Sequence, residues 1–166
     1  MVQGRNKAIF LDRDGTLNRD FGYVYLTGQL ELLPGVVEAL TIFRDAGFLL
    51  IVVTNQSGVG RGYYTENEAT IFNKALNEVL EKNGVGITAF YVCYHSPEDK
   101  CICRKPSPYL INKAINDFNI DSQRSFLFGD KDSDIKCGEN VPVTSFLITE
   151  ERTLLFWAKT LMRYFS

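Results

Sequence analysis

Five short apolar runs alternate with stretches of helical spacing along this chain, and the alternation is the feature that most restricts its fold. The runs are strand-sized and rich in β-branched and aromatic residues, and they cover residues 7–11, 48–54, 89–94, 125–128 and 143–148. The helical stretches cover residues 34–47 and 65–83, begin again near 107 and 130, and close the chain from about 154. Alternation of this kind implies βαβ units and a mostly parallel sheet covered on both faces. We therefore expect a three-layer α/β/α sandwich with its site at the carboxyl ends of the strands.

Composition and charge restrict the classes of function open to the chain. With 166 residues, of which 45% are hydrophobic and 23% charged, it is expected to form one domain over residues 1–166. A net charge of −2 gives no field that attracts nucleic acid or a membrane surface, so any basic site must be local. The first apolar run is too short for a signal peptide and no segment has the length of a membrane span, which predicts a cytoplasmic protein. No extended apolar stripe is left over, and a monomer is expected.

The first predicted strand ends at two aspartates, Asp12 and Asp14. Carboxylates two residues apart project to the same side of an extended chain, so both can reach one cation or one substrate. One carboxylate can attack phosphorus while the second protonates the leaving oxygen and later activates water. The alternative is that the Asp14-Gly15 pair forms only a turn. Three further strand ends favour the catalytic interpretation.

Polar side chains follow the later strands as well. Residues 54–57, which are Thr-Asn-Gln-Ser, offer hydroxyl and amide groups that suit a phosphate, although an ordinary polar loop has the same composition. Asp130 opens a helix and is expected at the least as a helix cap; beside Asp12 and Asp14 it would complete a cluster of three carboxylates. Such a cluster is self-repelling unless a cation such as Mg²⁺ binds it. Lys105 follows the third strand and is either a phosphate-neutralising lysine or a solvated surface residue.

Three of the four cysteines and the single histidine fall within eleven positions, as Cys93, His95, Cys101 and Cys103. Disulfides are not expected in a reducing compartment. Three thiolates and one imidazole form a complete tetrahedral set, which predicts a structural Zn²⁺ site with no open position. Metal binding would close this loop and aim the adjoining Arg104 into the site.

The four strand ends resemble, in order and placement, the four motifs of the haloacid dehalogenase (HAD) superfamily of phosphotransferases. The resemblance implies a Rossmann-like, HAD-like fold with no large cap domain, and a Mg²⁺-dependent phosphatase. Asp12 would be the nucleophile and Asp14 the general acid/base, while Thr54 and Lys105 would stabilise the phosphate. Mg²⁺ would bind Asp12, Asp130 and the carbonyl of Asp14.

Two zinc-loop groups of this superfamily are similar to the chain: the D-glycero-D-manno-heptose-1,7-bisphosphate 7-phosphatases and the histidinol-phosphate phosphatases. Residues 18–24 and 54–62 resemble the heptose group, which implies removal of the 7-phosphate of the heptose bisphosphate. Tyr94, where proline is usual, and the short loop between His95 and Cys101 leave the histidinol assignment open as the alternative. The resemblance implies substrate contacts by Asp20, Phe21, Gly22 and Tyr23 for the sugar, by Asn55, Gln56 and Ser57, by Arg104 for the distal phosphate, and by Lys131.

Other classes of protein share parts of this pattern. A nucleic-acid 3′-phosphatase would need a basic, aromatic-interleaved face, which the sequence lacks. A receiver-type signalling domain also has acidic strand ends with a Thr and a Lys, but it needs neither a second carboxylate two residues after the first nor a zinc loop. A binding module with an inactive site would not keep all four motifs. Asp134 is either a supporting acidic residue of the fourth motif or a first-turn carboxylate that favours the helix dipole.

Overall fold

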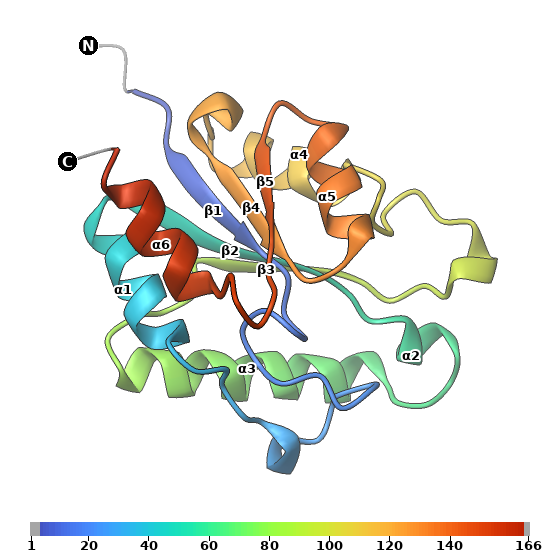
Figure 1. The fold of residues 1–166 in the computed structure, drawn as a ribbon. Helices are drawn as coiled ribbons and strands as arrows, with labels where there is room; N and C mark the ends of the chain where they lie inside the picture. Colours follow the sequence, from blue (N-terminus) through green and yellow to red (C-terminus); the bar gives the residue numbers. More distant parts are fainter. Residues whose placement is uncertain (1–3, 165–166) are drawn as a thin grey trace.

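The computed structural model describes residues 4–164, which form a five-stranded sheet with helices on both faces (Figure 1). The strands are β1 (Lys7–Leu11), β2 (Phe48–Asn55), β3 (Ala89–Cys93), β4 (Phe126–Gly129) and β5 (Thr144–Leu147). They lie in the order β3-β2-β1-β4-β5, and every neighbouring pair is parallel. The predicted three-layer α/β/α sandwich is confirmed, and the five predicted strands lie within one residue of their expected ends.

The two helical layers follow from the alternation of side chains along the strands. Helices α1 (Val36–Asp45), α3 (Glu66–Lys82) and α6 (Leu154–Met162) share one core with Ile9 and Leu11 of β1. Helices α4 (Tyr109–Asp117) and α5 (Asp132–Glu139) share the other core with Ala8 and Phe10, the residues that alternate with them. Figure 1 shows the two groups of helices on opposite sides of the sheet.

Helix ends follow local chemistry. Thr65 precedes α3, and its Oγ1 accepts from the N–H of Glu68 at 3.1 Å while the Glu68 carboxylate accepts from the N–H of Thr65 at 2.8 Å. The helix α1 begins at Val36, two residues after Pro34, because Gly35 adopts a left-handed φ of 79°. The short helices α2 (Ser57–Gly60), η1 (Thr27–Gln29), η2 (Pro97–Asp99) and η3 (Ser122–Arg124) lie in the connections.

The strand order fixes where a site can form. The chain passes from β1 to β2 and β3 on one side, and then returns to place β4 and β5 on the other side of β1. The crevice between the carboxyl ends of β1 and β4 is therefore the topological switch point, where ligands bind in sheets of this kind. Leu11 pairs with Val52 on one side and Phe128 on the other, which sets the residues that follow these strands side by side. In the described part of the chain, no helix combines the length and apolar character needed to cross a membrane.

Candidate active site

Asp12 lies at the switch point as the first residue beyond β1. Its N–H donates to the carbonyl of Phe128 at 2.9 Å, and the residue is only 5% exposed. The ammonium of Lys105, itself 3% exposed, lies 3.0 Å from Asp12 Oδ1. Burial raises the pKa of Asp12, but the charge of Lys105 and its hydrogen bond outweigh burial and hold the pKa below its ordinary value. The carboxylate is thus kept ionised, as a nucleophile must be.

Three carboxylates gather at this point: those of Asp12, Asp130 and Asp134 lie within 4.8 Å of one another. Burial, and then the charge of Asp12, raise the pKa of Asp130 to about 7. Asp130 Oδ1 is buried and has no hydrogen-bond partner among residues 4–164. Oxygen ligands that are crowded, acidic and unsatisfied fit Mg²⁺. The sequence prediction placed Asp14 in this cluster, but its carboxylate lies apart, and the third member is Asp134.

Asp134 enters the site because the first turn of α5 points inward. It is 1% exposed, lies 2.6 Å from Lys105 Nζ, and accepts from the N–H of Lys131 at 3.1 Å. Burial, and then the charge of Asp12, raise its pKa. Lys105 therefore joins two buried carboxylates, and their opposite charges keep the ammonium protonated despite burial, with a raised pKa. Of the two interpretations of Asp134, the geometry favours the supporting role over a solvated helix terminus.

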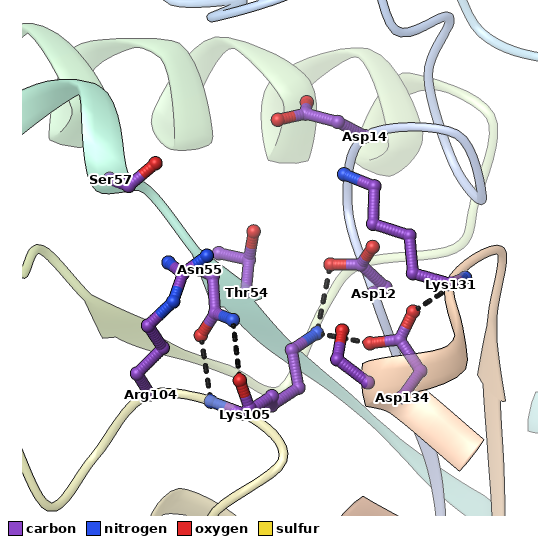
Figure 2. Close-up of a pocket in the computed structure, with 10 residues that line it drawn as sticks. Asp12, Asp14, Thr54, Asn55, Ser57, Arg104, Lys105, Lys131 and Asp134 are labelled. Atoms are coloured by element: carbon purple, nitrogen blue, oxygen red, sulfur yellow. Dashed lines mark hydrogen bonds and ion pairs between the residues drawn. The ribbon is translucent and has the colours of Figure 1, made fainter. Parts of the chain in front are cut away.

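Asp14 is held by other partners. Its two carboxylate oxygens accept from Arg13 Nε and Nη2, each at 2.9 Å, and also from Asn18 Nδ2 at 2.9 Å and Gln56 Nε2 at 3.1 Å. Figure 2 shows the Asp14 carboxylate turned away from that of Asp12. Arg13, whose side chain is wholly buried, was not singled out from the sequence. An arginine between two aspartates reads as a surface residue, and only the packing around it reveals its position.

A polar cavity of about 100 Å³ opens above Asp12 (Figure 2). Its lining includes Asp12, Asp14, Thr54, Asn55, Ser57, Arg104, Lys105, Lys131 and Asp134. Asn55 accepts from the N–H of Lys105 at 3.0 Å and donates to its carbonyl at 3.2 Å, so it fixes the backbone that carries the lysine. Arg104 Nη1 is buried without a hydrogen-bond partner in the described chain, which leaves it available to an anion. The cavity has the size and charge for a phosphoryl group.

A second cavity, of about 240 Å³, adjoins the first. Its lining consists of Asp14, Asp20, Gly22, Tyr23, Asn55, Gln56, Ser57, Tyr64 and Lys131. The structure thus brings most of the predicted substrate contacts together. Phe21 is the exception, since it is 54% exposed and lines a separate hollow together with Gly28 and Leu30.

Gln56 lines the second cavity and is 2% exposed. Its amide donates to Thr54 Oγ1 at 2.9 Å as well as to Asp14, and its carbonyl accepts from Tyr64 Oη at 2.6 Å and from Arg13. The sequence predicted a substrate contact for this side chain. Both the nitrogen and the oxygen of this amide are engaged by neighbouring side chains, which suits a role in orienting Asp14 and Thr54.

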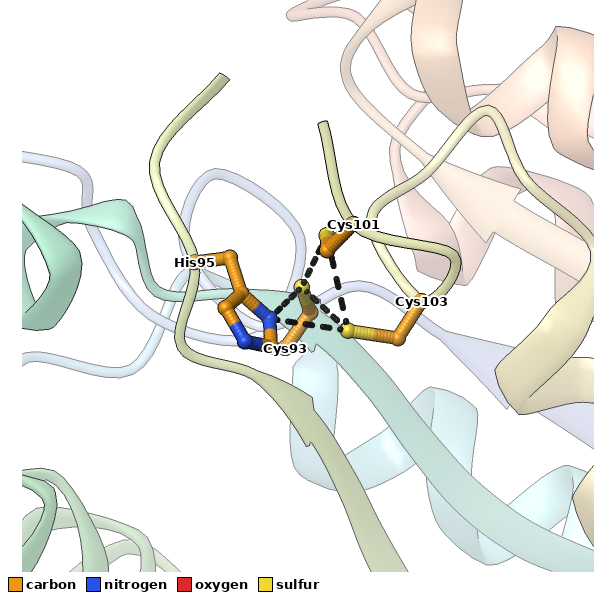
Figure 3. Close-up of side chains that lie close together, drawn as sticks. All are labelled: Cys93, His95, Cys101 and Cys103. Carbon is orange, nitrogen blue, oxygen red and sulfur yellow. Dashed lines mark hydrogen bonds between the residues drawn. The ribbon is translucent and has the colours of Figure 1, made fainter. Parts of the chain in front are cut away.

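The four predicted zinc ligands converge at the end of β3 (Figure 3). The Sγ atom of Cys93 lies 3.6 Å from that of Cys101 and 2.7 Å from that of Cys103, and His95 Nδ1 lies 3.2 Å from Cys103 Sγ. One ligand atom from each of the four lies within 4.8 Å of the others, and all the cysteines are free. Three sulfurs and one imidazole nitrogen gathered in this way are the donor set of a tetrahedral structural Zn²⁺ site. The fourth cysteine, Cys137, is buried in α5 outside the cluster.

Comparison with known proteins gives consistent results. Residues 102–157 match a family described as HAD-hydrolase-like. The chain is 42% identical over 150 residues to a D-glycero-beta-D-manno-heptose-1,7-bisphosphate 7-phosphatase of Helicobacter pylori, covering 90% of this chain and 86% of the relative. It is 40% identical over 150 residues to the protein of that name from Pasteurella multocida, covering 87% of this chain and 82% of the relative.

Among solved structures, a D,D-heptose 1,7-bisphosphate phosphatase from B. bronchiseptica, complexed with magnesium and phosphate, superposes with a TM-score of 0.87. The two chains are 25% identical, and the alignment covers 95% of this chain and 99% of the other. The chain therefore shares its fold with a structure that is complexed with magnesium and phosphate.

Proposed function

The chain belongs to the family of D-glycero-D-manno-heptose-1,7-bisphosphate 7-phosphatases, and from this premise we propose that it hydrolyses the 7-phosphate of a heptose 1,7-bisphosphate through an aspartyl-phosphate at Asp12. The observation that carries the proposal is the buried contact of 3.0 Å between the Asp12 carboxylate and the Lys105 ammonium, at the floor of a phosphate-sized cavity. A nucleophile kept ionised beside a fixed positive charge suits attack on a phosphate ester.

In the first half-reaction an oxygen of Asp12 forms a bond to phosphorus, and the bond between phosphorus and the C7 oxygen breaks. The proton of the Asp14 carboxyl passes to that oxygen, which leaves as the sugar hydroxyl. Thr54, which is 1% exposed, can donate its hydroxyl to a phosphoryl oxygen. Lys105, whose ammonium already contacts Asp12, Asp134 and the Val53 carbonyl, supplies a positive charge beside the phosphoryl group. Their fixed positions favour the transition state because they need no reorganisation.

In the second half-reaction the Asp14 carboxylate takes a proton from water, and the water oxygen attacks phosphorus. The bond between phosphorus and Asp12 breaks, which releases inorganic phosphate and restores the carboxylate. Mg²⁺ held by Asp12, Asp130 and the carbonyl of Asp14 would neutralise the charge on the phosphoryl group. The unpartnered oxygen of Asp130 supports that assignment. A structural Zn²⁺ would bind the four ligands at the end of β3.

The charges around the site suit a substrate with two phosphates. Arg104 and Lys131 both line the phosphate cavity, and Lys131 also reaches the adjoining one, where it lies 3.6 Å from Asp20. The adjoining cavity offers hydroxyl, amide and carboxylate groups to a polyol. We assign the heptose moiety to this cavity and the distal phosphate to Arg104.

The test is the release of phosphate from heptose 1,7-bisphosphate with Mg²⁺, both anomers being compared with histidinol phosphate at equal concentration. The β anomer is examined first, because the relatives' names specify it. We expect a higher kcat/KM for the bisphosphate and a product that retains the 1-phosphate in ³¹P NMR. A higher kcat/KM for histidinol phosphate, or loss of the 1-phosphate, would contradict the substrate assignment.

A further inference from the structure

Arg13 stands between the two catalytic aspartates in the sequence, and its side chain is wholly buried. A buried guanidinium loses its hydration, and this loss is tolerated only when the group is paired and hydrogen-bonded. Arg13 makes five hydrogen bonds: two to Asp14, one to Asn73 Oδ1 at 2.9 Å, one to the Val24 carbonyl at 2.6 Å and one to Gln56 Oε1 at 3.1 Å. The acceptors around this position therefore match the donors of a guanidinium.

The pairing of Arg13 with Asp14 is bidentate, with Nε on one oxygen and Nη2 on the other. A planar guanidinium that bonds both oxygens fixes the orientation of the carboxylate as well as its position. Lysine, which carries a single point of charge, cannot do this. The carboxylate that the proposed mechanism uses twice is thus aligned by a group that touches neither cavity.

The place at which Arg13 holds Asp14 is specific. Asp14 lines both the cavity assigned to the phosphoryl group and the cavity assigned to the sugar. The oxygen that leaves phosphorus belongs to both of these groups, so its acid must lie where the two cavities meet. Figure 2 shows the carboxylate of Asp14 apart from that of Asp12.

Arg13 also joins the general acid/base to the segments around it. Its guanidinium lies 4.4 Å from the centre of the Phe72 ring on α3, next to Asn73 on the same helix. Val24 follows directly on residues 20–23, the segment assigned to the sugar. The orientation of Asp14 and the backbone of the sugar-binding loop are therefore fixed by one side chain.

We propose that Arg13 is a positioning residue for phosphoryl transfer. It holds Asp14 at the boundary of the two cavities and fixes its position relative to residues 20–23, the sugar-binding loop. This inference rests on the proposed function, because it uses the role of Asp14 as acid and base. Its consequence is selective: loss of Arg13 should impair the steps that need a proton and spare the attack by Asp12.

The test compares leaving groups in Arg13→Lys. An alkyl phosphate needs its leaving oxygen protonated, whereas the phenolate of 4-nitrophenyl phosphate leaves unaided. We expect kcat/KM for the sugar phosphate to fall by about 100-fold or more, the typical contribution of a positioned acid. For the aryl phosphate kcat/KM should fall less than about fivefold. A burst of nitrophenolate equal to the enzyme concentration should also appear, because hydrolysis of the aspartyl-phosphate still needs the base.

Arg44→Lys is the matched control, since Arg44 also precedes an aspartate and bonds it, but lies exposed on α1. It should leave kcat/KM for both substrates and the thermal midpoint unchanged. If Arg13→Lys does not fold, Asn73→Ala removes a neighbour of the guanidinium and should produce the same bias between leaving groups in weaker form. Equal losses on both substrates without a burst, or no loss on either, would overturn the proposal.

A failure of the role proposed for Arg13 can be distinguished from a failure of the proposed function. A wild-type chain that hydrolyses another alkyl phosphate but not heptose bisphosphate contradicts the substrate assignment, and the leaving-group comparison is then made on that alkyl ester with the same expectations for Arg13. A wild-type chain that hydrolyses no phosphate ester overturns both.

Discussion

Lys105 supplies the positive charge that compensates two buried carboxylates of the site. It is buried together with Asp12 and Asp134, and its ammonium lies 3.0 Å from one carboxylate and 2.6 Å from the other. Each of these three side chains would be costly to bury alone, and the lysine offsets the repulsion between the two acids. Its backbone is fixed in turn by the paired hydrogen bonds of Asn55. The nucleophile and its counter-ion are thus set in place before a substrate binds.

Replacement of this lysine should therefore affect stability as well as catalysis. Lys105→Met leaves the carboxylates of Asp12 and Asp134 uncompensated, and we expect the free energy of unfolding to fall by about 3 kcal/mol in metal-free buffer. Adding Asp134→Asn should restore part of the loss, because the two side chains interact directly. Urea unfolding of both single variants and the double variant measures this coupling, with Lys113→Met, an exposed lysine paired to Asp117, as the control. Strict additivity would contradict the proposed pairing.

At the scale of elements, the loop between β3 and α4 carries both the cysteine cluster and the residues that reach the phosphate. The carbonyl of Tyr94 accepts from the N–H of Gly60 at 2.8 Å, and Arg61 lies 3.6 Å from Glu98. The loop therefore also contacts the end of α2 and the residue that follows it. A β-carbon at Gly60 would lie 2.5 Å from the backbone N of Ser96, which explains the glycine at this close approach. Cys103 is followed at once by Arg104 and Lys105. Ordering of the cysteine cluster therefore also orders the backbone of these two residues of the site.

Disruption of the cluster should reduce order first and activity second. In Cys101→Ser we expect zinc content below one per chain and a lower thermal midpoint, followed by loss of activity as Lys105 loses its fixed backbone. Cys137→Ser is the matched control, because this buried cysteine lies outside the cluster and donates to the Ser107 carbonyl; its zinc content should stay unchanged. Zinc is measured by atomic emission and the midpoint by calorimetry. A folded, metal-free and fully active Cys101→Ser would remove the structural role of zinc.

At the scale of the whole molecule, the strand order brings the ends of β1, β2, β3 and β4 to one edge of the sheet. Residues that directly follow those strands could be assigned from the sequence, because their position is set by parallel pairing alone. Asp12 and Asp130 belong to this group, and Thr54 lies at the end of β2 itself. Lys105 lies far beyond the end of β3 and reaches them through the loop whose backbone Asn55 fixes.

Arg13 and Asp134 could not be assigned in the same way. Whether Arg13 points into the protein depends on Phe72 and Asn73 on a helix about sixty residues away. Whether the first turn of α5 points inward depends on Lys105, which comes from another loop. For the same reason Asp14 was expected beside Asp12 and is instead drawn away by Arg13. Local pattern predicts the ends of strands, and tertiary packing decides which charged neighbours turn toward one another.

Covalent catalysis at Asp12 underlies the proposed reaction, and one measurement tests it directly. The enzyme is quenched during turnover of heptose 1,7-bisphosphate and reduced with borohydride, which converts an aspartyl-phosphate to homoserine, and its peptides are analysed by mass spectrometry. We expect homoserine at position 12 in the wild type and none in Asp12→Asn, which should be inactive but folded. Homoserine at another aspartate, or turnover that persists in Asp12→Asn, would contradict it.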